Sequence, residues 1–200
     1  MITTVKPKLT FEEFLELSPN CSHYELVDGE LVERSITRNH IDIADFLDRC
    51  FYDEVKRSDL SYVIKQSVLL RTLSQDGTEQ GRMPDVSVID RDDWRANRSD
   101  YAALRSPIQL AVEVVSTNWD DDYIDKLDEY QRMGIHEYWI VDYLALGGRE
   151  YLGKPKLPTI FVYVLDDKGE YQRSMFRGND AIASSTFPEL QLTAEQILKA

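Results

Sequence analysis

The sequence has little cysteine and no long apolar run, and each absence excludes a class of protein. Its two cysteines, Cys21 and Cys50, have no metal-ligand spacing, so we expect two reduced thiols in a cytoplasmic protein. No apolar stretch approaches the roughly 20 residues that a membrane helix needs. The first ten residues lack the apolar middle of a secretory signal peptide. We therefore expect no membrane association.

Positive charge is also scarce. The chain carries 23 basic and 36 acidic residues, which gives a formal net charge of −13. Broad electrostatic attraction to a phosphate backbone is therefore disfavoured. A local basic groove stays compatible with this balance, because steering depends on where the charges lie. Clustered acids can also hold a divalent cation, which would reverse the local sign.

The most informative stretch begins with the apolar run Leu110–Val115, in which five of six residues are apolar. Short runs of this kind, rich in valine, are typical of buried strands. Glu113 lies inside the run, and a buried carboxylate is costly unless it is paired, protonated or bound to a cation. The run therefore predicts both a central strand and a chemically unusual acid.

A helix and a second strand follow. Three aspartates at positions 120–122 suit the positive end of a helix dipole, and Gly134 suits its carboxyl end. Asp122, Lys126 and Tyr130 are spaced by four residues, so they share one face of this helix. The apolar run 138–141 then predicts the next strand, which completes a strand–helix–strand unit.

The remaining patterns predict a single domain over residues 1–200. Hairpins are expected around Asp28-Gly29 and around residues 166–169, where turn residues separate alternating runs. The other expected elements are a capped helix from Thr10 that ends at residues 18–20, a helix to about Val55, one strand over 62–71, a turn at 74–77, a strand over 85–89, a surface excursion over 91–107 with a helical turn near Trp94, a loop over 143–158, and a capped helix from Thr193.

Asp85 and Glu113 form the candidate site. Asp85 opens one predicted strand and Glu113 lies within the next strong one. If these strands are neighbours, both carboxylates can face one point. Two carboxylates with added water suit Mg²⁺ or Mn²⁺, and a bound cation activates water and stabilises charge on phosphoryl oxygens. From spacing alone, a solvated or salt-bridged role for these acids is favoured over metal binding.

A set of markers in a fixed order resembles a known family, the Uma-two family of restriction-endonuclease-like proteins, a branch of the PD-(D/E)XK nuclease superfamily. The resemblance covers about Leu9 to Leu198. The markers are Tyr24-Glu25-Leu26-Val27-Asp28-Gly29-Glu30, His40, Pro84-Asp85-Val86, Val112-Glu113-Val114-Val115-Ser116, Asp122, Lys126, Tyr130 and Glu137-Tyr138-Trp139-Ile140-Val141-Asp142.

The resemblance implies an α/β fold of the restriction-endonuclease type, in which helices flank a central mixed sheet with additional hairpins. It also implies a metal-dependent phosphodiesterase site. Asp85 matches the aspartate of PD, and Glu113 matches the first acid of (D/E)XK. The chain departs at the next step, because Val115 occupies the lysine position, and the lysine is displaced onto the following helix as Lys126. Glu25 matches a family marker and is a candidate further metal ligand.

Each of these residues also has a simpler structural interpretation. His40 matches a family marker and is a candidate catalytic residue, yet it begins a helix and can simply cap or pair. Tyr130 is a second candidate, although a packing role with a hydrogen-bonded hydroxyl is the favoured interpretation. Glu25 can pair with a cation of the hairpin. Trp139 is expected in the core, and Asp122 is the one acid of 120–122 that merits testing.

Three functions remain open. The first is a DNA endonuclease that uses Mg²⁺ or Mn²⁺, acting as a homodimer in which the apolar residues Phe161, Val162 and Tyr163 contribute to the interface. The second is a catalytically idle binding or scaffold protein on the same fold, which the net charge and Val115 favour. The third is a hydrolase in which the two carboxylates act as general acid and base, for which the lysine has no natural role.

Overall fold

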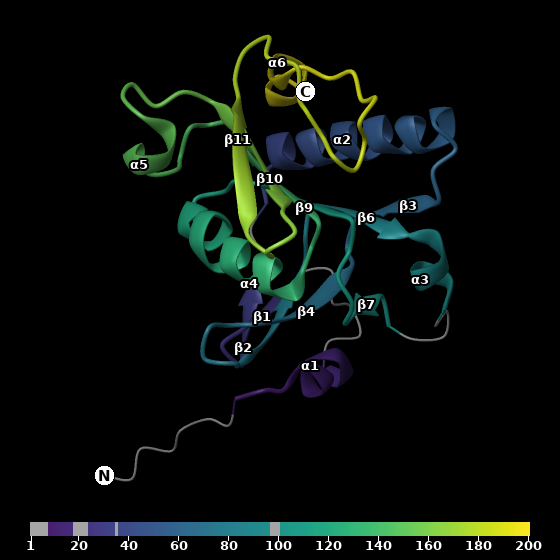
Figure 1. The fold of residues 1–200 in the computed structure, drawn as a ribbon. Helices are drawn as coiled ribbons and strands as arrows, with labels where there is room; N and C mark the ends of the chain where they lie inside the picture. The colour runs from purple at the N-terminus through teal and green to yellow at the C-terminus, as the bar shows by residue number, and fades with distance from the viewer. Residues whose placement is uncertain (1–7, 18–23, 35, 97–100) are drawn as a thin grey trace.

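The computed structural model describes residues 8–17, 24–34, 36–96 and 101–200. Two β-sheets lie at its centre with helices packed around them, which confirms the predicted mixed α/β class (Figure 1). The helical segments are α1 (Phe11–Leu17), α2 (Arg38–Arg57), α3 (Arg91–Ala96), the π-helical turn η2 (Asp121–Asp125), α4 (Lys126–Met133), α5 (Arg149–Leu152) and α6 (Ala194–Leu198).

The larger sheet has six strands in the order β11-β10-β9-β8-β6-β3. These strands are β3 (Tyr62–Lys65), β6 (Val86–Asp90), β8 (Leu110–Val114), β9 (Glu137–Asp142), β10 (Thr159–Leu165) and β11 (Tyr171–Phe176). Strands β8 and β9 are parallel and the other neighbours are antiparallel. The helix between β8 and β9 makes this pair the predicted strand–helix–strand unit.

The smaller sheet has five strands in the order β2-β1-β5-β4-β7. They are β1 (Tyr24–Val27), β2 (Glu30–Glu33), β4 (Leu69–Leu73), β5 (Glu79–Arg82) and β7 (Ala103–Leu104). Asp28 and Gly29 both have positive φ, as the hairpin between β1 and β2 requires, so this predicted turn is confirmed. Helix α1 packs against this sheet through Phe11 and Phe14.

Alternation along β8 explains where the candidate acids point. Leu110, Val112 and Val114 face α2 and α6 and belong to one core cluster. Ala111 and Val115 lie in the opposite cluster, which contains residues of η2 and α4. Because side chains alternate between the faces of a strand, Glu113 is directed toward the side that η2 and α4 cover. The sequence therefore determines the face on which the acid meets Lys126.

The structure corrects several sequence predictions. The single strand expected over 62–71 is wrong: β3 and β4 are separated by Ser67, whose positive φ breaks the strand, and they enter different sheets. Strand β5 and helix α5 were not predicted. The end of the first helix at residues 18–20 and the state of Cys21 lie outside the described residues, whereas Cys50 is a free thiol.

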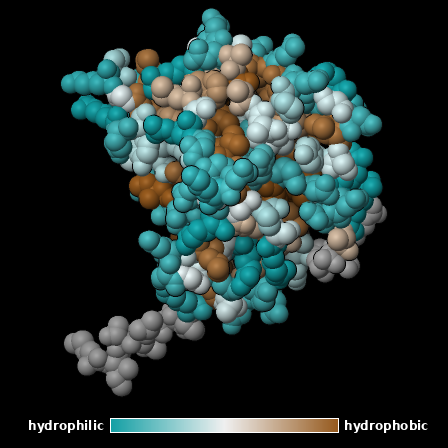
Figure 2. Space-filling view, viewed as in Figure 1, coloured by the Kyte–Doolittle hydropathy of each residue, from teal (hydrophilic) through white to brown (hydrophobic). Residues whose placement is uncertain are grey.

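The residues expected to contribute to a homodimer interface are also wrong. Phe161, Val162 and Tyr163 are buried within the protomer, between β9 and β11, so they are not available to a second copy. On the face drawn in Figure 2 the surface is mostly hydrophilic, and hydrophobic residues lie in small patches. None of the helices in the described part of the chain has the length and apolarity needed to cross a membrane.

Candidate metal-binding site

A pocket of about 140 Å³ lies where the two sheets, the start of α2 and the turn η2 meet. Its lining contains more acids than cations. The acids are Glu25, Glu33, Asp85, Glu113, Asp121 and Asp122, and the cations are Arg34 and Lys126, with His40 beside them. The pocket therefore carries an excess of negative charge, although much of its lining is buried.

Asp85 directly precedes β6 and is fixed by contacts to both of its oxygens. Its Oδ2 accepts a hydrogen bond from the backbone N–H of Val114 at 2.7 Å, which ties it to β8. Its Oδ1 lies 2.6 Å from the Arg34 guanidinium and 2.9 Å from His40 Nε2. Burial alone would raise the pKa of Asp85, but contacts with His40 and Arg34 lower the pKa to about 2. Asp85 is therefore an ionised carboxylate inside the pocket.

Glu113 lies on the neighbouring strand and is 2% exposed. Tyr130 donates its hydroxyl to Glu113 Oε1 at 2.7 Å, and Lys126 Nζ lies 3.0 Å from Oε2. Burial raises the pKa of Glu113 well above its usual value, and the neighbouring carboxylates of Asp85 and Asp122 add to this effect against the opposing charge of Lys126. A positive ion in the pocket would therefore stabilise the ionised form of Glu113.

Lys126 reaches the pocket from the first position of α4. Besides Glu113, its amino group contacts Asp122 Oδ1 at 3.1 Å and lies 3.7 Å from Glu25 Oε1. These carboxylates outweigh burial and raise the pKa of Lys126, so it remains an ammonium group. The displaced lysine thus lies beside the second candidate acid, as the resemblance implies.

Asp122 is buried, unlike the exposed acid Asp120 before it. It lies in the π-helical turn η2. Such turns are rare in proteins, and those that occur are often found at functional sites. Burial raises the pKa of Asp122 to about 6, in spite of its contact with Lys126. The predicted helix start is therefore not simply solvated, because two of its three aspartates, Asp121 and Asp122, line the pocket.

Glu25 enters from β1 of the smaller sheet. Its Oε1 accepts a hydrogen bond from the backbone N–H of Met83 at 2.9 Å, and it lies near Lys126, Arg82 and Arg34. Burial opposes ionisation, but these three cations lower the pKa of Glu25. The expected pairing with hairpin cations is thus present only in part, because two of the partners come from β5 and α4.

His40 and Tyr130 have different relations to the pocket. His40 lines it, and its buried Nε2 has no hydrogen-bond partner among the described residues, although Asp85 Oδ1 is 2.9 Å away. The backbone N–H of His40 donates to the side chain of Thr37, which is the residue that caps α2, so His40 itself does not cap the helix. Tyr130 is fully buried, donates its hydroxyl to Glu113 and does not itself line the pocket.

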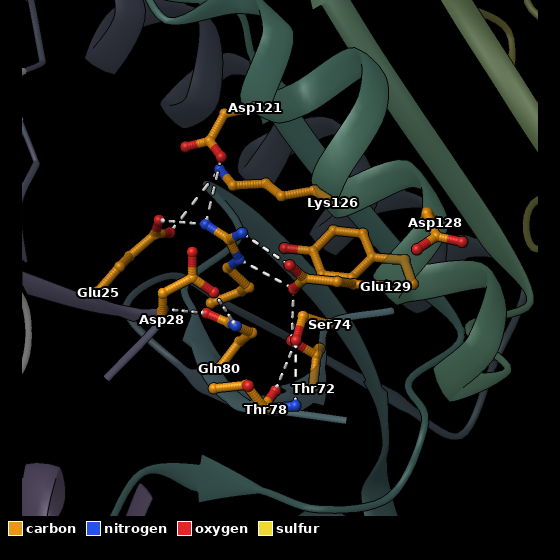
Figure 3. Close-up of polar contacts among 12 residues, drawn as sticks. Glu25, Asp28, Thr72, Ser74, Thr78, Gln80, Asp121, Lys126, Asp128 and Glu129 are labelled. Atoms are coloured by element: carbon orange, nitrogen blue, oxygen red, sulfur yellow. Dashed lines mark hydrogen bonds and ion pairs between the residues drawn. The ribbon is translucent and has the colours of Figure 1, made fainter. Parts of the chain in front are cut away.

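Behind the pocket, a buried ion-pair network links the smaller sheet to α4. Arg82 of β5 pairs with Glu129 of α4 through two nitrogens at 2.7 and 2.9 Å, and Thr72 donates to the same carboxylate at 2.6 Å. Arg82 also lies 3.4 Å from Asp121 and 3.7 Å from Glu25. Figure 3 shows the carboxylates of Glu25, Asp121 and Glu129 on different sides of one cluster of polar contacts. The network orients α4, and thereby Lys126, against the sheet.

Sequence reasoning missed Arg34 and Arg82. A signal for Arg34 existed, because the Asp28-Gly29 turn sets Val32 opposite Glu25, and Arg34 follows two residues later on the same face. Arg82 had no comparable signal, because β5 reads Glu-Gln-Gly-Arg and has no apolar pattern. A larger hollow of about 900 Å³ lies near α3, β3 and β7, where Asp93 is the single acid among the described residues that line it. The candidate chemistry therefore belongs to the smaller pocket.

The donor set of the smaller pocket fits a divalent cation. Carboxylate oxygens are the ligands that Mg²⁺ and Mn²⁺ prefer, and Mg²⁺ binds through one or two carboxylates while it keeps several waters. His40 Nε2, which lies 2.9 Å from Asp85 Oδ1, adds a nitrogen donor to this set. In the present arrangement, no three His, Cys, Asp or Glu side chains of the described ranges are grouped closely enough to hold a metal ion. Arg34 and Lys126 occupy the space between the acids instead.

The two sheets and the acidic pocket define a protein of the restriction-endonuclease-like class. The family model Uma2, described as "Putative restriction endonuclease", matches residues 11–195, so the chain belongs to this family. A solved structure of a "putative nuclease belonging to DUF820" from Anabaena variabilis ATCC 29413 has a similar fold, with 16% identity and a TM-score of 0.70. The match covers 96% of this chain and 98% of that chain. No curated protein gives a significant match.

Proposed function

We propose that the protein is a divalent-metal-dependent endonuclease that hydrolyses DNA phosphodiester bonds. One observation carries the proposal: Asp85 and Glu113, on adjoining chain segments of one sheet, line an acidic pocket together with Lys126. Membership in a family described as restriction endonucleases supports the reaction class. Mg²⁺ or Mn²⁺ bound by these acids would lower the pKa of a water and stabilise charge on the phosphoryl group.

The proposal gives the residues of the chain distinct roles. Asp85 and Glu113 hold the metal, and Glu25 is a further acid beside them. Lys126 orients the attacking water or stabilises the charge that develops at phosphorus. It can do so because the neighbouring carboxylates, Glu113 among them, keep its amino group protonated. Tyr130 fixes Glu113 through its hydroxyl, which aims the carboxylate at the pocket. His40 acts through Asp85, because its Nε2 contacts Asp85 Oδ1.

A binding or scaffold protein with an idle pocket is the second candidate. The observation that favours it is the balance of charge, because six acids and two cations line the pocket of a chain whose net charge is −13. Such a lining repels a phosphate backbone in the absence of a metal ion. A divalent cation would reduce this repulsion, so the two candidates differ in their response to metal.

The test is cleavage of plasmid and single-stranded DNA in Mg²⁺ or Mn²⁺ by the wild type and by Asp85→Ala, Glu113→Gln and Lys126→Ala. The proposal predicts cleavage by the wild type, loss of at least about 100-fold in each variant, and loss on chelation. Asp128→Asn is the matched control, since Asp128 is half-exposed on α4 and does not line the pocket. Undiminished cleavage by Asp85→Ala would contradict the assigned site, and metal binding without cleavage would favour the scaffold.

A further inference from the structure

Arg34 occupies the position on Asp85 that a metal ion would need. It follows β2, and its guanidinium lies 2.6 Å from Asp85 Oδ1 and 3.9 Å from Glu25 Oε1. Burial disfavours its charge, but Asp85, Glu113 and Glu25 more than compensate and raise the pKa of Arg34. A permanently charged side chain thus acts as counter-ion to the acids of the pocket.

The carboxylate oxygens of the site are already occupied by protein groups. Val114 binds one oxygen of Asp85, and Arg34 and His40 contact the other. On Glu113, Tyr130 binds one oxygen and Lys126 contacts the other. A metal ion can therefore coordinate Asp85 through Oδ1 only if a cation that now contacts this atom gives way.

The two cations of the pocket differ in how firmly they are held. Lys126 lies within 3.1 Å of two carboxylates and starts a helix that the buried Arg82–Glu129 pair anchors. Arg34 has one close carboxylate partner, its side chain is 16% exposed, and it follows an edge strand whose four residues are all exposed. Arg34 can therefore withdraw toward solvent with little disturbance, whereas Lys126 cannot.

We propose that Arg34 is a built-in counter-cation that competes with the divalent metal for Asp85 and must withdraw before the metal binds. This inference rests on the proposed function, because it concerns the same metal site. Insertion of Arg34 keeps the acids paired in the metal-free protein. The apparent metal affinity is then the intrinsic affinity multiplied by the fraction of molecules in which Arg34 has withdrawn. The hairpin cation thus regulates loading of the site.

The first test follows the Arg34 side chain directly. In protein labelled with ¹⁵N-arginine, the Arg34 Nε–H signal is assigned from its loss in Arg34→Lys, and Mg²⁺ is then titrated. We expect the Arg34 signal to shift and lose its protection from solvent exchange as the metal binds. The Arg177 Nε–H, which donates to the Thr159 hydroxyl away from the pocket, is the internal reference and should not change. An unchanged Arg34 signal at saturating Mg²⁺ would overturn the inference.

The second test is the Mn²⁺ affinity of Arg34→Gln, measured by calorimetry. The competition predicts binding several-fold to about 10-fold tighter than in the wild type. Arg132→Gln removes the same charge from a partly exposed pair with Asp128 and should leave the affinity unchanged. Equal or weaker binding by Arg34→Gln would refute the competition. If the wild type cleaves DNA while Arg34→Gln binds no tighter, the inference alone fails; if no variant binds metal, the proposed function fails with it.

Discussion

Two groups of buried acids, one on β9 and one around the neighbouring strand β8, are stabilised in different ways. Glu137 and Asp142 begin and end β9 and are fully buried. Glu137 accepts hydrogen bonds from the Trp139 indole, the Thr186 backbone N–H and two serine hydroxyls, Ser184 and Ser185. Asp142 accepts bonds from the Tyr123 hydroxyl and two loop backbone N–H groups. Neutral donors thus surround both carboxylates.

The acids around β8 have another environment. Glu113 and Asp122 are held mainly by Lys126 and lie at the wall of a pocket. Their pKa values are raised, because burial and repulsion from neighbouring carboxylates outweigh the single ammonium group. A buried acid therefore does not by itself indicate chemistry. The combination of too few cations, close carboxylates and an open pocket does indicate it.

Glu129 combines the two arrangements, and its removal should have the largest effect on stability. It is buried against the Arg82 guanidinium and also accepts the Thr72 hydroxyl. Glu129→Ala leaves a buried arginine without its main partner, which costs about 3–5 kcal/mol. Urea unfolding measures the loss. Asp128→Ala, which removes a half-exposed acid from the same helix, should cost less than about 1 kcal/mol, and equal losses would contradict the assignment.

Glu137→Ala should separate structural acids from those of the pocket. The substitution leaves the Trp139 and Thr186 N–H donors without their acceptor, so we expect a loss of about 2–3 kcal/mol. At 20–25 °C, where the variant remains folded, its Mn²⁺ affinity should equal that of the wild type, because Glu137 does not line the pocket. A large loss of metal affinity in the folded variant would break the distinction between the two groups.

Tyr130→Phe should have the smallest effect and tests positioning alone. The change keeps the buried ring and removes the hydroxyl that holds Glu113 Oε1. Groups that orient a metal ligand typically contribute 10- to 100-fold to affinity, so we expect Mn²⁺ to bind about 10-fold more weakly. Tyr171→Phe is the matched control, since its hydroxyl donates to the Ile135 carbonyl instead. Equal Mn²⁺ affinities in the two variants would exclude a positioning role for Tyr130.

The sequence predicted the parts of the fold that local patterns determine. The Asp28-Gly29 turn, the apolar run of β8 and the helix cap at Gly134 each carry a short-range signal, and all three are observed. Helix spacing also predicted that Asp122, Lys126 and Tyr130 share a face. These three side chains lie near Glu113 because β8 and β9 pair in parallel, so the helix that connects them packs over β8.

Other features depend on contacts between distant segments. Strand β5 lacks an apolar alternation, because its buried members include Gln80 and Arg82, which are satisfied by Asp28 and Glu129. The boundary between β3 and β4 depends on the positive φ of Ser67. A serine at this position does not by itself predict a positive φ. The partners of Glu137 also have no signal in the sequence, because the Ser184, Ser185 and Thr186 groups that bind it lie 47–49 residues further along the chain.

The central claim is that the acids around β8, and not those of β9, form a metal site. Calorimetric titration of Mn²⁺ into the wild type, Glu113→Gln and Glu137→Gln tests it directly. The account predicts that the wild type and Glu137→Gln bind equally and that Glu113→Gln binds at least about 10-fold more weakly. Full Mn²⁺ affinity in Glu113→Gln, or an equal loss in Glu137→Gln, would contradict it.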